Sequence, residues 1–153
     1  HIITGHEKDG GSSIDFEALA KLKGTLVFLM GICNLDNITN SLIKYGKSPD
    51  TPAAVIMKGT TPGQKTAVGT LSNIGDKVRQ AGIKNPAVIV IGQVVNLRDE
   101  LSWYEEGKLF GKRILFLGTG FSDEPTPRRD LPFYELKQEG AEVIICPTLK
   151  ISS

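Results

Sequence analysis

The chain has 153 residues, of which 40% are hydrophobic and 23% are charged, so it is long enough for a packed core and its composition excludes a disordered or fibrous protein. Its 18 basic and 17 acidic residues give a net charge of +1, which provides no electrostatic attraction to nucleic acid or to an anionic membrane. We therefore expect a small molecule or another protein as the partner, and neither nucleic acid nor a membrane.

Short apolar runs alternate with stretches of helical period along the first half of the chain, an order that is typical of an α/β fold. Phe16, Leu19 and Ala20 predict a first helix, which a capping box formed by Ser12 and Asp15 could begin. The elements expected next are a strand over 25–30, a helix with its apolar stripe over 35–42, and a strand over 53–58.

The middle of the chain predicts a hairpin and a central strand. Turn residues over 59–64 separate the strand over 53–58 from alternating residues over 65–71, so an antiparallel pair is expected and the sheet should be mixed. A helix over 74–81 then leads to 87–91, the run richest in β-branched residues. We expect this run to be a central and fully buried strand.

A domain boundary is expected after residue 107. Leu97, Leu101 and Tyr104 predict a short helix, and the segment 105–108 then has the composition of a linker. The elements beyond it form a predicted βαβ unit: a strand over 113–117, a helix over 131–139 and a strand over 142–146. The fold class is therefore α/β, with a mixed, mostly parallel sheet and flanking helices, followed by an appended βαβ unit.

The cysteines indicate the compartment. Cys33 and Cys146 lie in separate apolar segments without the spacing of a disulfide framework or a metal site, which favours a reducing, cytoplasmic location. No apolar run reaches the roughly 18 residues of a membrane helix. The chain begins with His1 rather than Met, so we expect a piece of a longer protein.

Residues that could act in catalysis are scarce. The chain has two histidines, His1 and His6, and neither a G-x-S-x-G elbow nor an H-E-x-x-H metal motif is present. His6 and Glu7 could place an imidazole beside a carboxylate, but the glycines and charges that follow favour a solvated turn. We therefore assign no catalytic residue and no metal site.

Gly118 and Gly120 follow a predicted strand and resemble the beginning of a dinucleotide-binding loop. Asp123 stands where that fingerprint has its third glycine, and Pro125 and Pro127 lengthen the loop, so no helix begins where the pyrophosphate would lie. A free-standing nucleotide-binding module of Rossmann or flavodoxin type is the alternative function.

Two other segments are better candidates for a ligand site. Met30-Gly31 and the run 58–62 each lie at the carboxyl end of a predicted strand, where open α/β sheets bind ligands. A flexible thioether such as Met30 suits the face of a planar base, and a glycine such as Gly59 allows a ligand to approach the main chain. Two simpler explanations stay open, because Gly59 could serve a turn that needs a positive φ and Met30 could belong to the core.

A series of short motifs runs through residues 1–107. They are Thr4-Gly5-His6-Glu7, Gly24-Thr25-Leu26-Val27, Leu29-Met30-Gly31, Leu42-Ile43-x-x-Gly46, Pro52-Ala53-Ala54-Val55, Gly59-Thr60-Thr61-Pro62-x-Gln64, Gly69-Thr70-Leu71, Pro86-Ala87 and Gly92-x-Val94-Val95-x-Leu97-Arg98. Together these motifs resemble the carboxyl-terminal half of the tetrapyrrole (precorrin-type) methylase family, in its uroporphyrinogen-III C-methyltransferase branch.

This resemblance implies an enzyme that binds S-adenosylmethionine in a cleft between two α/β domains and releases S-adenosylhomocysteine. It also implies uroporphyrinogen III as the substrate, methylated twice to precorrin-2 for sirohaem and cobalamin, and a homodimer. The family's cofactor contacts fall on Met30, Gly59 and Thr60. Its glycine-rich loop and its acid and base candidates lie in an amino-terminal half outside this chain, so we expect the chain alone to be inactive.

Residues 108–153 carry a second set of motifs, Leu109-Phe110-Gly111-Lys112-Arg113 and the run from Gly140 to Thr148. They resemble the opening βαβ unit of the uroporphyrinogen-III synthase family. That family usually has Thr-Arg where this chain has Leu117-Gly118 or Gly118-Thr119, so no site residue is transferred. The two resemblances together imply a bifunctional parent protein in which a methylase is fused to a synthase.

Overall fold

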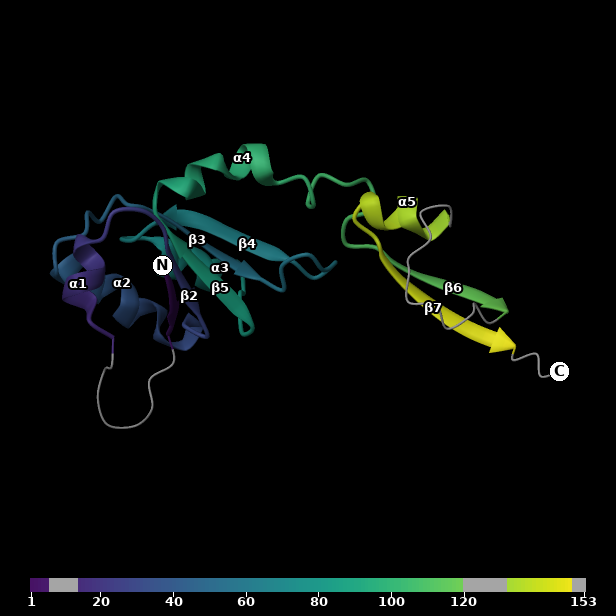
Figure 1. Cartoon of the computed structure of the whole chain (residues 1–153), viewed down its shortest axis with the longest axis horizontal. Coiled ribbons are helices and arrows are strands. Elements are labelled where there is room, and N and C mark those ends of the chain that lie inside the picture. The colour runs from purple at the N-terminus through teal and green to yellow at the C-terminus, as the bar shows by residue number, and fades with distance from the viewer. Residues whose placement is uncertain (6–13, 120–131, 150–153) are drawn as a thin grey trace. The chain divides into compact units, whose positions relative to one another are not determined.

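The structure, a computed structural model, describes residues 1–5, 14–119 and 132–149. The chain divides into two compact units (Figure 1). Unit 1 consists of His1–Gly59 and Gln64–Leu101, and unit 2 consists of Thr60–Gly63 and Ser102–Ser153. Each unit has its own sheet, of five strands in unit 1 and of two strands in unit 2.

Unit 1 is a sheet with helices packed on it. Its strands are β1 (Ile2–Thr4), β2 (Leu26–Leu29), β3 (Pro52–Met57), β4 (Lys65–Thr70) and β5 (Ala87–Ile91). Its α-helices are α1 (Phe16–Lys21), α2 (Leu35–Lys44), α3 (Ile74–Gln80) and α4 (Arg98–Leu101), with 3-10 helices η1 (Ile32–Asn34) and η2 (Gln93–Leu97). The strands lie in the order β1-β2-β5-β3-β4.

The sheet of unit 1 is mixed, as predicted, but the expectation that it is mostly parallel is wrong. β1 and β2 pair in parallel, whereas β2–β5, β5–β3 and β3–β4 are antiparallel. β2 and β3 run in the same direction through a helical connection, but β5 lies between them, so each has an antiparallel neighbour. The expected hairpin is confirmed, with a register from Pro52 opposite Thr70 to Met57 opposite Lys65.

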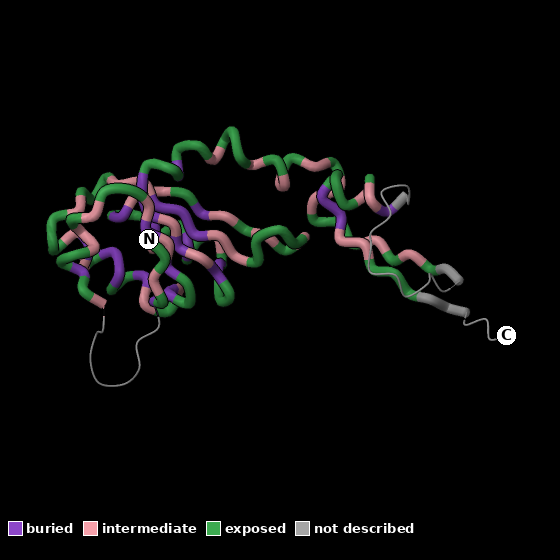
Figure 2. The backbone as a smooth tube through the Cα atoms, viewed as in Figure 1, coloured by how far each residue is buried: buried purple, intermediate pink, exposed green. Residues whose placement is uncertain are grey.

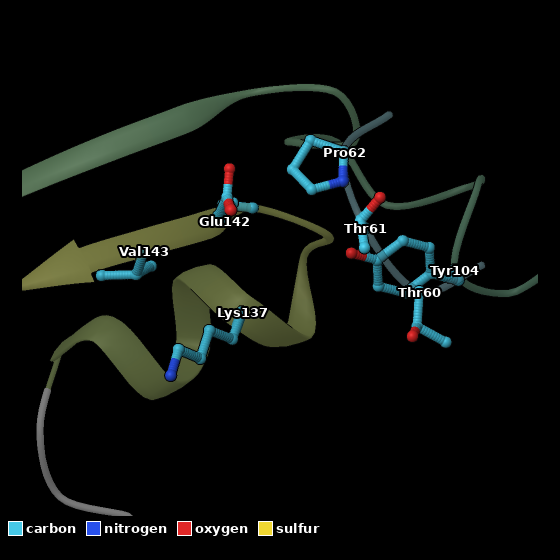
Figure 3. A pocket seen from close by; sticks show the side chains of 8 residues that line it. Thr60, Thr61, Pro62, Tyr104, Lys137, Glu142 and Val143 are labelled. Carbon is cyan, nitrogen blue, oxygen red and sulfur yellow. The ribbon is translucent and has the colours of Figure 1, made fainter. Parts of the chain in front are cut away.

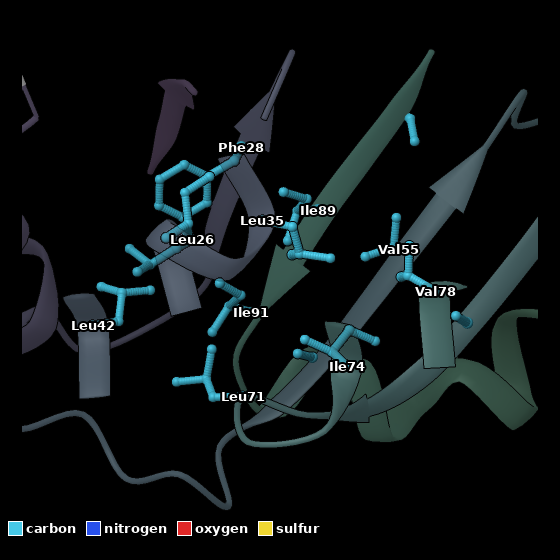
Figure 4. Close-up of a cluster of buried hydrophobic side chains, with 14 of the residues drawn as sticks. Leu26, Phe28, Leu35, Leu42, Val55, Leu71, Ile74, Val78, Ile89 and Ile91 are labelled. Carbon is cyan, nitrogen blue, oxygen red and sulfur yellow. The ribbon is translucent and has the colours of Figure 1, made fainter. Parts of the chain in front are cut away.

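The core of unit 1 lies between the sheet and helices α1, α2 and α3; Figure 4 shows its side chains. Alternate residues of each strand point toward these helices because side chains alternate across a sheet. The largest side chains with less than 2% exposure are Phe28, Leu26, Ile38, Leu42, Ile74, Ile89, Ile91 and Val55. Each such side chain stabilises the fold by about 1.5–3 kcal/mol relative to an exposed one.

β5 is the central strand, as predicted, but it is not buried on both sides. Ala87, Ile89 and Ile91 are buried against the helices, whereas Val88 and Val90 are half-buried on the opposite face. Because the helices of the core cover one face of the sheet, burial along β5 alternates instead of being complete. Figure 2 shows the buried residues gathered in the strands of unit 1.

The helix ends follow local chemistry. The carboxylate of Asp15 accepts a hydrogen bond from the amide of Ala18 at 2.9 Å, so Asp15 is itself the N-cap of α1. The expected box, with Ser12 as the cap, is therefore wrong, and Ser12 lies outside the described residues. Glu17 accepts a hydrogen bond from Lys21 Nζ at 2.7 Å, and this bond raises the pKa of Lys21.

The opposite face of the sheet is partly covered by η2 and α4. Val95 of η2 is buried, and a shallow cavity of about 260 Å³ lies between this segment and the strands. Its lining residues are Ala54, Ile56, Gln64, Thr66, Val90, Val94, Val95, Arg98 and Leu101. The helix predicted from Leu97, Leu101 and Tyr104 is thus shorter than expected, since α4 ends at Leu101 and Tyr104 belongs to unit 2.

Unit 2 contains the predicted βαβ elements, β6 (Arg113–Thr119), α5 (Pro132–Gln138) and β7 (Glu142–Leu149). β6 and β7 pair in parallel. α5 covers one face of this two-stranded sheet, where the rings of Phe116 and Phe133 meet edge to face with centroids 6.1 Å apart. On the other face Leu115, Leu117 and Ile144 are 57%, 61% and 41% exposed.

Within the described ranges, no helix has both the length and the apolar composition needed to cross a membrane. The same residues contain no cluster of three or more His, Cys, Asp or Glu side chains placed to hold a metal ion.

Candidate functional site

The topology of unit 1 brings the two predicted site segments to one edge of the sheet. β2 and β3 both run antiparallel to β5, and Leu29 and Ile56 are both paired with Val88 of β5. The two strands are therefore separated there by two interstrand spacings, about 10 Å. Met30 and Gly59 follow their strands at this edge, on either side of the start of β5.

Met30 is not a core residue, so that simpler explanation of its presence is wrong. Its residue surface is 63% exposed, although its neighbour Gly31 is buried. The backbone of Met30 has φ 55, in the left-handed region that residues other than glycine rarely adopt. Such conformations persist where the surrounding structure enforces them, and they concentrate at functional sites.

The motifs Thr4-Gly5 and Met30-Gly31 are in direct contact. A Cβ atom on Gly5 would lie 2.6 Å from the Cα atom of Gly31, so the contact requires glycine at position 5. A Cβ atom on Gly31 would lie 3.0 Å from the Cδ1 atoms of both Ile38 and Ile89. The loop that carries Met30 is thus packed tightly on both sides, and the side chain of Met30 remains accessible.

Gly59 has no conformational reason to be glycine. Its φ is not in the left-handed region, which is occupied instead by its neighbours Lys58 (φ 49) and Thr60 (φ 60). A Cβ atom on Gly59 would meet nothing closer than Ile56 Cγ2 at 3.5 Å, an ordinary contact distance. The explanation of Gly59 as a positive-φ turn residue is therefore wrong, and its packing does not require glycine either.

Thr60, the third predicted contact, groups with unit 2 rather than with Met30 and Gly59. There it lines a cavity of about 340 Å³ (Figure 3). The other residues that line this cavity are Thr61, Pro62, Tyr104, Lys137, Ala141, Glu142 and Val143. The structure thus places two of the three predicted residues at one sheet edge of unit 1 and assigns the third to the other unit.

Of the remaining sequence candidates, the following lie outside the described residues: His6, Glu7, Gly120, Asp123, Pro125 and Pro127. Gly118 lies within β6, where it is paired with Pro147, so the glycine loop of a dinucleotide fingerprint does not begin there. This position gives no support to the nucleotide-binding alternative.

Sequence reasoning missed Asn34 and Asn85, which both contact the loop that carries Met30. Asn34 Nδ2 donates a hydrogen bond to the carbonyl of Gly5 at 3.0 Å, and Asn85 Nδ2 donates to Cys33 Sγ at 3.1 Å. Both bonds join residues far apart in the chain, so neither spacing nor periodicity could have predicted them.

The chain is similar to curated proteins of porphyrin biosynthesis. It is 38% identical over 152 residues to the porphyrin biosynthesis protein HemD of Ruminiclostridium josui, covering 99% of this chain. It is 40% identical over 148 residues to the uroporphyrinogen-III C-methyltransferase of Bacillus subtilis (strain 168), covering 95% of this chain. A sirohaem synthase of Neisseria meningitidis is 47% identical over 104 residues, or 68% of this chain. No protein-family model matches the chain.

Solved structures with a similar fold are also methyltransferases. The native uroporphyrin-III C-methyltransferase of Thermus thermophilus has a TM-score of 0.54 and 25% identity over 63% of this chain. A second structure of that enzyme, in complex with S-adenosylhomocysteine, has the same TM-score of 0.54. A cobalt precorrin-4 methyltransferase has a TM-score of 0.56 and 25% identity over 61% of this chain.

The proteins that the chain resembles in sequence and in its α/β fold form a class of methyltransferases and other proteins of porphyrin and cobalamin biosynthesis. Within this class, the chain is homologous to a segment of the uroporphyrinogen-III C-methyltransferases. The chain spans 29% of the length of the Ruminiclostridium and Bacillus relatives, and 40% of the native Thermus structure.

Proposed function

We propose that this chain is part of a methyltransferase that uses S-adenosylmethionine to methylate uroporphyrinogen III, and that it carries one side of the cofactor site. The product would be precorrin-2, a precursor of sirohaem and cobalamin, and S-adenosylhomocysteine would be released. The similarity to named methyltransferases supports this proposal, as does the related fold that was solved with S-adenosylhomocysteine.

One observation carries the assignment of the site: an exposed methionine and an exposed glycine, which the fold does not require, share one sheet edge. Met30 presents its side chain to solvent from a left-handed backbone. Gly59 is exposed, although neither its φ nor its packing requires glycine. A ligand that approaches the main chain would explain the glycine, and a planar base would explain the thioether.

We assign three residues to the cofactor. The thioether of Met30 would lie against the base, and the main chain at Gly59 would allow close approach; Thr60 is a third contact. The cofactor supplies a methyl group on a sulfonium, and the protein's task is to hold it in line with the acceptor carbon. We expect no catalytic side chain from this chain, which would therefore not turn over substrate alone.

We further propose that residues 1–107 form the methylase part and residues 108–153 a synthase-like part. The matches to the sirohaem synthase of Neisseria meningitidis span 104 residues, close to the length of the first part, whereas the Ruminiclostridium and Bacillus proteins match over 152 and 148 residues. This difference supports a parent protein that combines the two enzymes. We expect a homodimer without nucleic acid or membrane partners.

A cytoplasmic location completes the proposal. Cys33 and Cys146 are both exposed free thiols. Such thiols are compatible with a reducing compartment.

Calorimetric titration with S-adenosylhomocysteine tests the site. We expect the chain to bind it and Gly59→Val to abolish binding, because the new side chain would cover the exposed main chain of this residue. Ser72→Val serves as the control, since it introduces the same side chain at an exposed turn after β4, at the opposite edge of the sheet. Unchanged binding by Gly59→Val would contradict the residue assignment, and absence of binding to the unmodified chain would contradict a cofactor site in this chain alone.

A further inference from the structure

Asn34 uses its side chain in an unusual way for its position. It is the N-cap residue of α2, where an asparagine side chain normally accepts a hydrogen bond from an amide of the first helical turn. Asn34 makes no such bond. Its Nδ2 atom instead donates to the carbonyl of Gly5, 29 positions earlier, at 3.0 Å in a partly buried environment. The side chain therefore connects two loops rather than capping its own helix.

Together with a backbone bond, this bond attaches the chain on both sides of Met30 to Gly5. The amide of Gly5 donates to the carbonyl of Leu29 at 2.7 Å, and the carbonyl of Gly5 accepts from Asn34. One peptide segment is thus bonded to the residue just before Met30 and to a side chain four positions after it. Gly31 packs closely against the side chain of Ile38. Between these attachments Met30 is 63% exposed, more than Leu29 at 39%, and its backbone is in the left-handed region.

The segment before β5 contacts both loops of the site. Asn85 Nδ2 donates to Cys33 Sγ at 3.1 Å, and the amide of Lys58 donates to the carbonyl of Pro86 at 3.3 Å. Sulfur is a weak acceptor, so the bond from Asn34 to Gly5 is the stronger attachment of the loop that carries Met30.

We propose that Asn34 is a positioning residue for the cofactor: it holds Met30 in its left-handed, exposed conformation before the cofactor arrives. This inference rests on the proposed function, because it assigns Asn34 a role in the same site. A loop that is already in its binding conformation needs no rearrangement, so the full intrinsic affinity is available. Asn34 acts through Met30 and does not itself touch the cofactor.

Asn34→Asp separates this role from a structural one. The change keeps the size of the side chain and removes the amide donor that bonds to Gly5. The aspartate side chain, which cannot donate to the Gly5 carbonyl, can turn away from it and accept a hydrogen bond from an amide in the first turn of α2. This new cap and its charge at the helix N-terminus offset the lost bond, so the thermal unfolding temperature should not fall. Asn40→Asp is the matched control, because Asn40 is an exposed residue of the same helix.

Two readouts are taken from each variant: amide hydrogen exchange of residues 29–35 and the affinity for S-adenosylhomocysteine measured by NMR titration. For Asn34→Asp we expect faster exchange in this segment. We also expect an affinity that is lower by a factor of at least about five, since fewer molecules hold Met30 in the conformation that binds the cofactor. Asn40→Asp should match the unmodified chain in both readouts.

The outcomes distinguish the two proposals. Unchanged exchange, or unchanged affinity, in Asn34→Asp would overturn the positioning role. A fall in unfolding temperature together with affinity would also overturn it, because a purely structural role predicts that pair of effects. If S-adenosylhomocysteine shifts the NMR signals of neither Met30 nor Gly59 in the unmodified chain, the assignment of the cofactor site to these residues is wrong, and the cofactor role of Asn34 is wrong with it. The exchange comparison still decides whether Asn34 holds the loop.

Discussion

Units 1 and 2 both combine a sheet with helices, but they differ in how far the sheet is covered. In unit 1 three helices pack on a five-stranded sheet, and Phe28, Ile89 and Ile91 have no exposed surface. In unit 2 one helix packs on two parallel strands, and Leu115 and Leu117 on the open face are more than half exposed. Parallel strands are normally covered on both faces, and among the described residues the sheet of unit 2 is the less covered of the two.

This difference locates the candidate site on the better-packed part. A cofactor contact needs a backbone that is held in place, and the Met30 loop is fixed by Gly5, Gly31 and Asn34. A two-stranded sheet is at best marginally stable without further packing. We therefore expect unit 1 to be the stable part of the chain and unit 2 to be the weaker one.

Alanine substitutions in the two sheets should give the largest difference between the units in the free energy of unfolding. Ile89→Ala should lower the free energy of unfolding of unit 1 by about 3 kcal/mol, because it leaves a cavity at a side chain with no exposed surface. Ile144→Ala, at a residue that is 41% exposed in unit 2, should cost less than about 1 kcal/mol. Urea unfolding followed by circular dichroism measures both. Equal losses would contradict the difference in packing between the units.

Alanine substitutions at two glycines of unit 1 should change the free energy of unfolding by smaller amounts. They show which of the two glycines the fold requires. Gly5→Ala should cost roughly 1–3 kcal/mol, because the new Cβ atom would lie 2.6 Å from Gly31 Cα. Gly59→Ala should change stability by less than about 0.5 kcal/mol, since its Cβ atom would meet nothing within 3.5 Å. The same unfolding experiment compares them. A large loss in Gly59→Ala would show that the fold itself requires this glycine.

The sequence predicts the local elements well because each has a local cause. The β-branched run over Ala87–Ile91 is the central strand, the turn chemistry after Met57 ends one arm of a hairpin, and the apolar stripe on Leu35, Ile38 and Leu42 belongs to α2. Strand order is different, because it depends on pairing between distant segments. Nothing in the alternation of strands and helices indicates that β5 lies between β2 and β3.

The candidate site was likewise predictable only in its local features. Its position at strand ends was predictable, since Met30 and Gly59 each follow an apolar run. The left-handed backbone of Met30 and the bond from Asn34 to Gly5 were not, because both depend on contacts between segments that lie far apart in the chain. Thr60 directly follows Gly59 in one motif, yet it groups with unit 2, and this grouping also depends on contacts that the sequence does not reveal.

Amide hydrogen exchange of the whole chain, with and without saturating S-adenosylhomocysteine, tests most directly whether the cofactor site lies at this edge of unit 1. We predict that the cofactor slows exchange in residues 29–34 and 57–60, which follow β2 and β3, and leaves β6 and β7 unchanged. Slower exchange confined to residues 113–119 and 142–149 would place the binding site in unit 2 and contradict the account given for Met30 and Gly59.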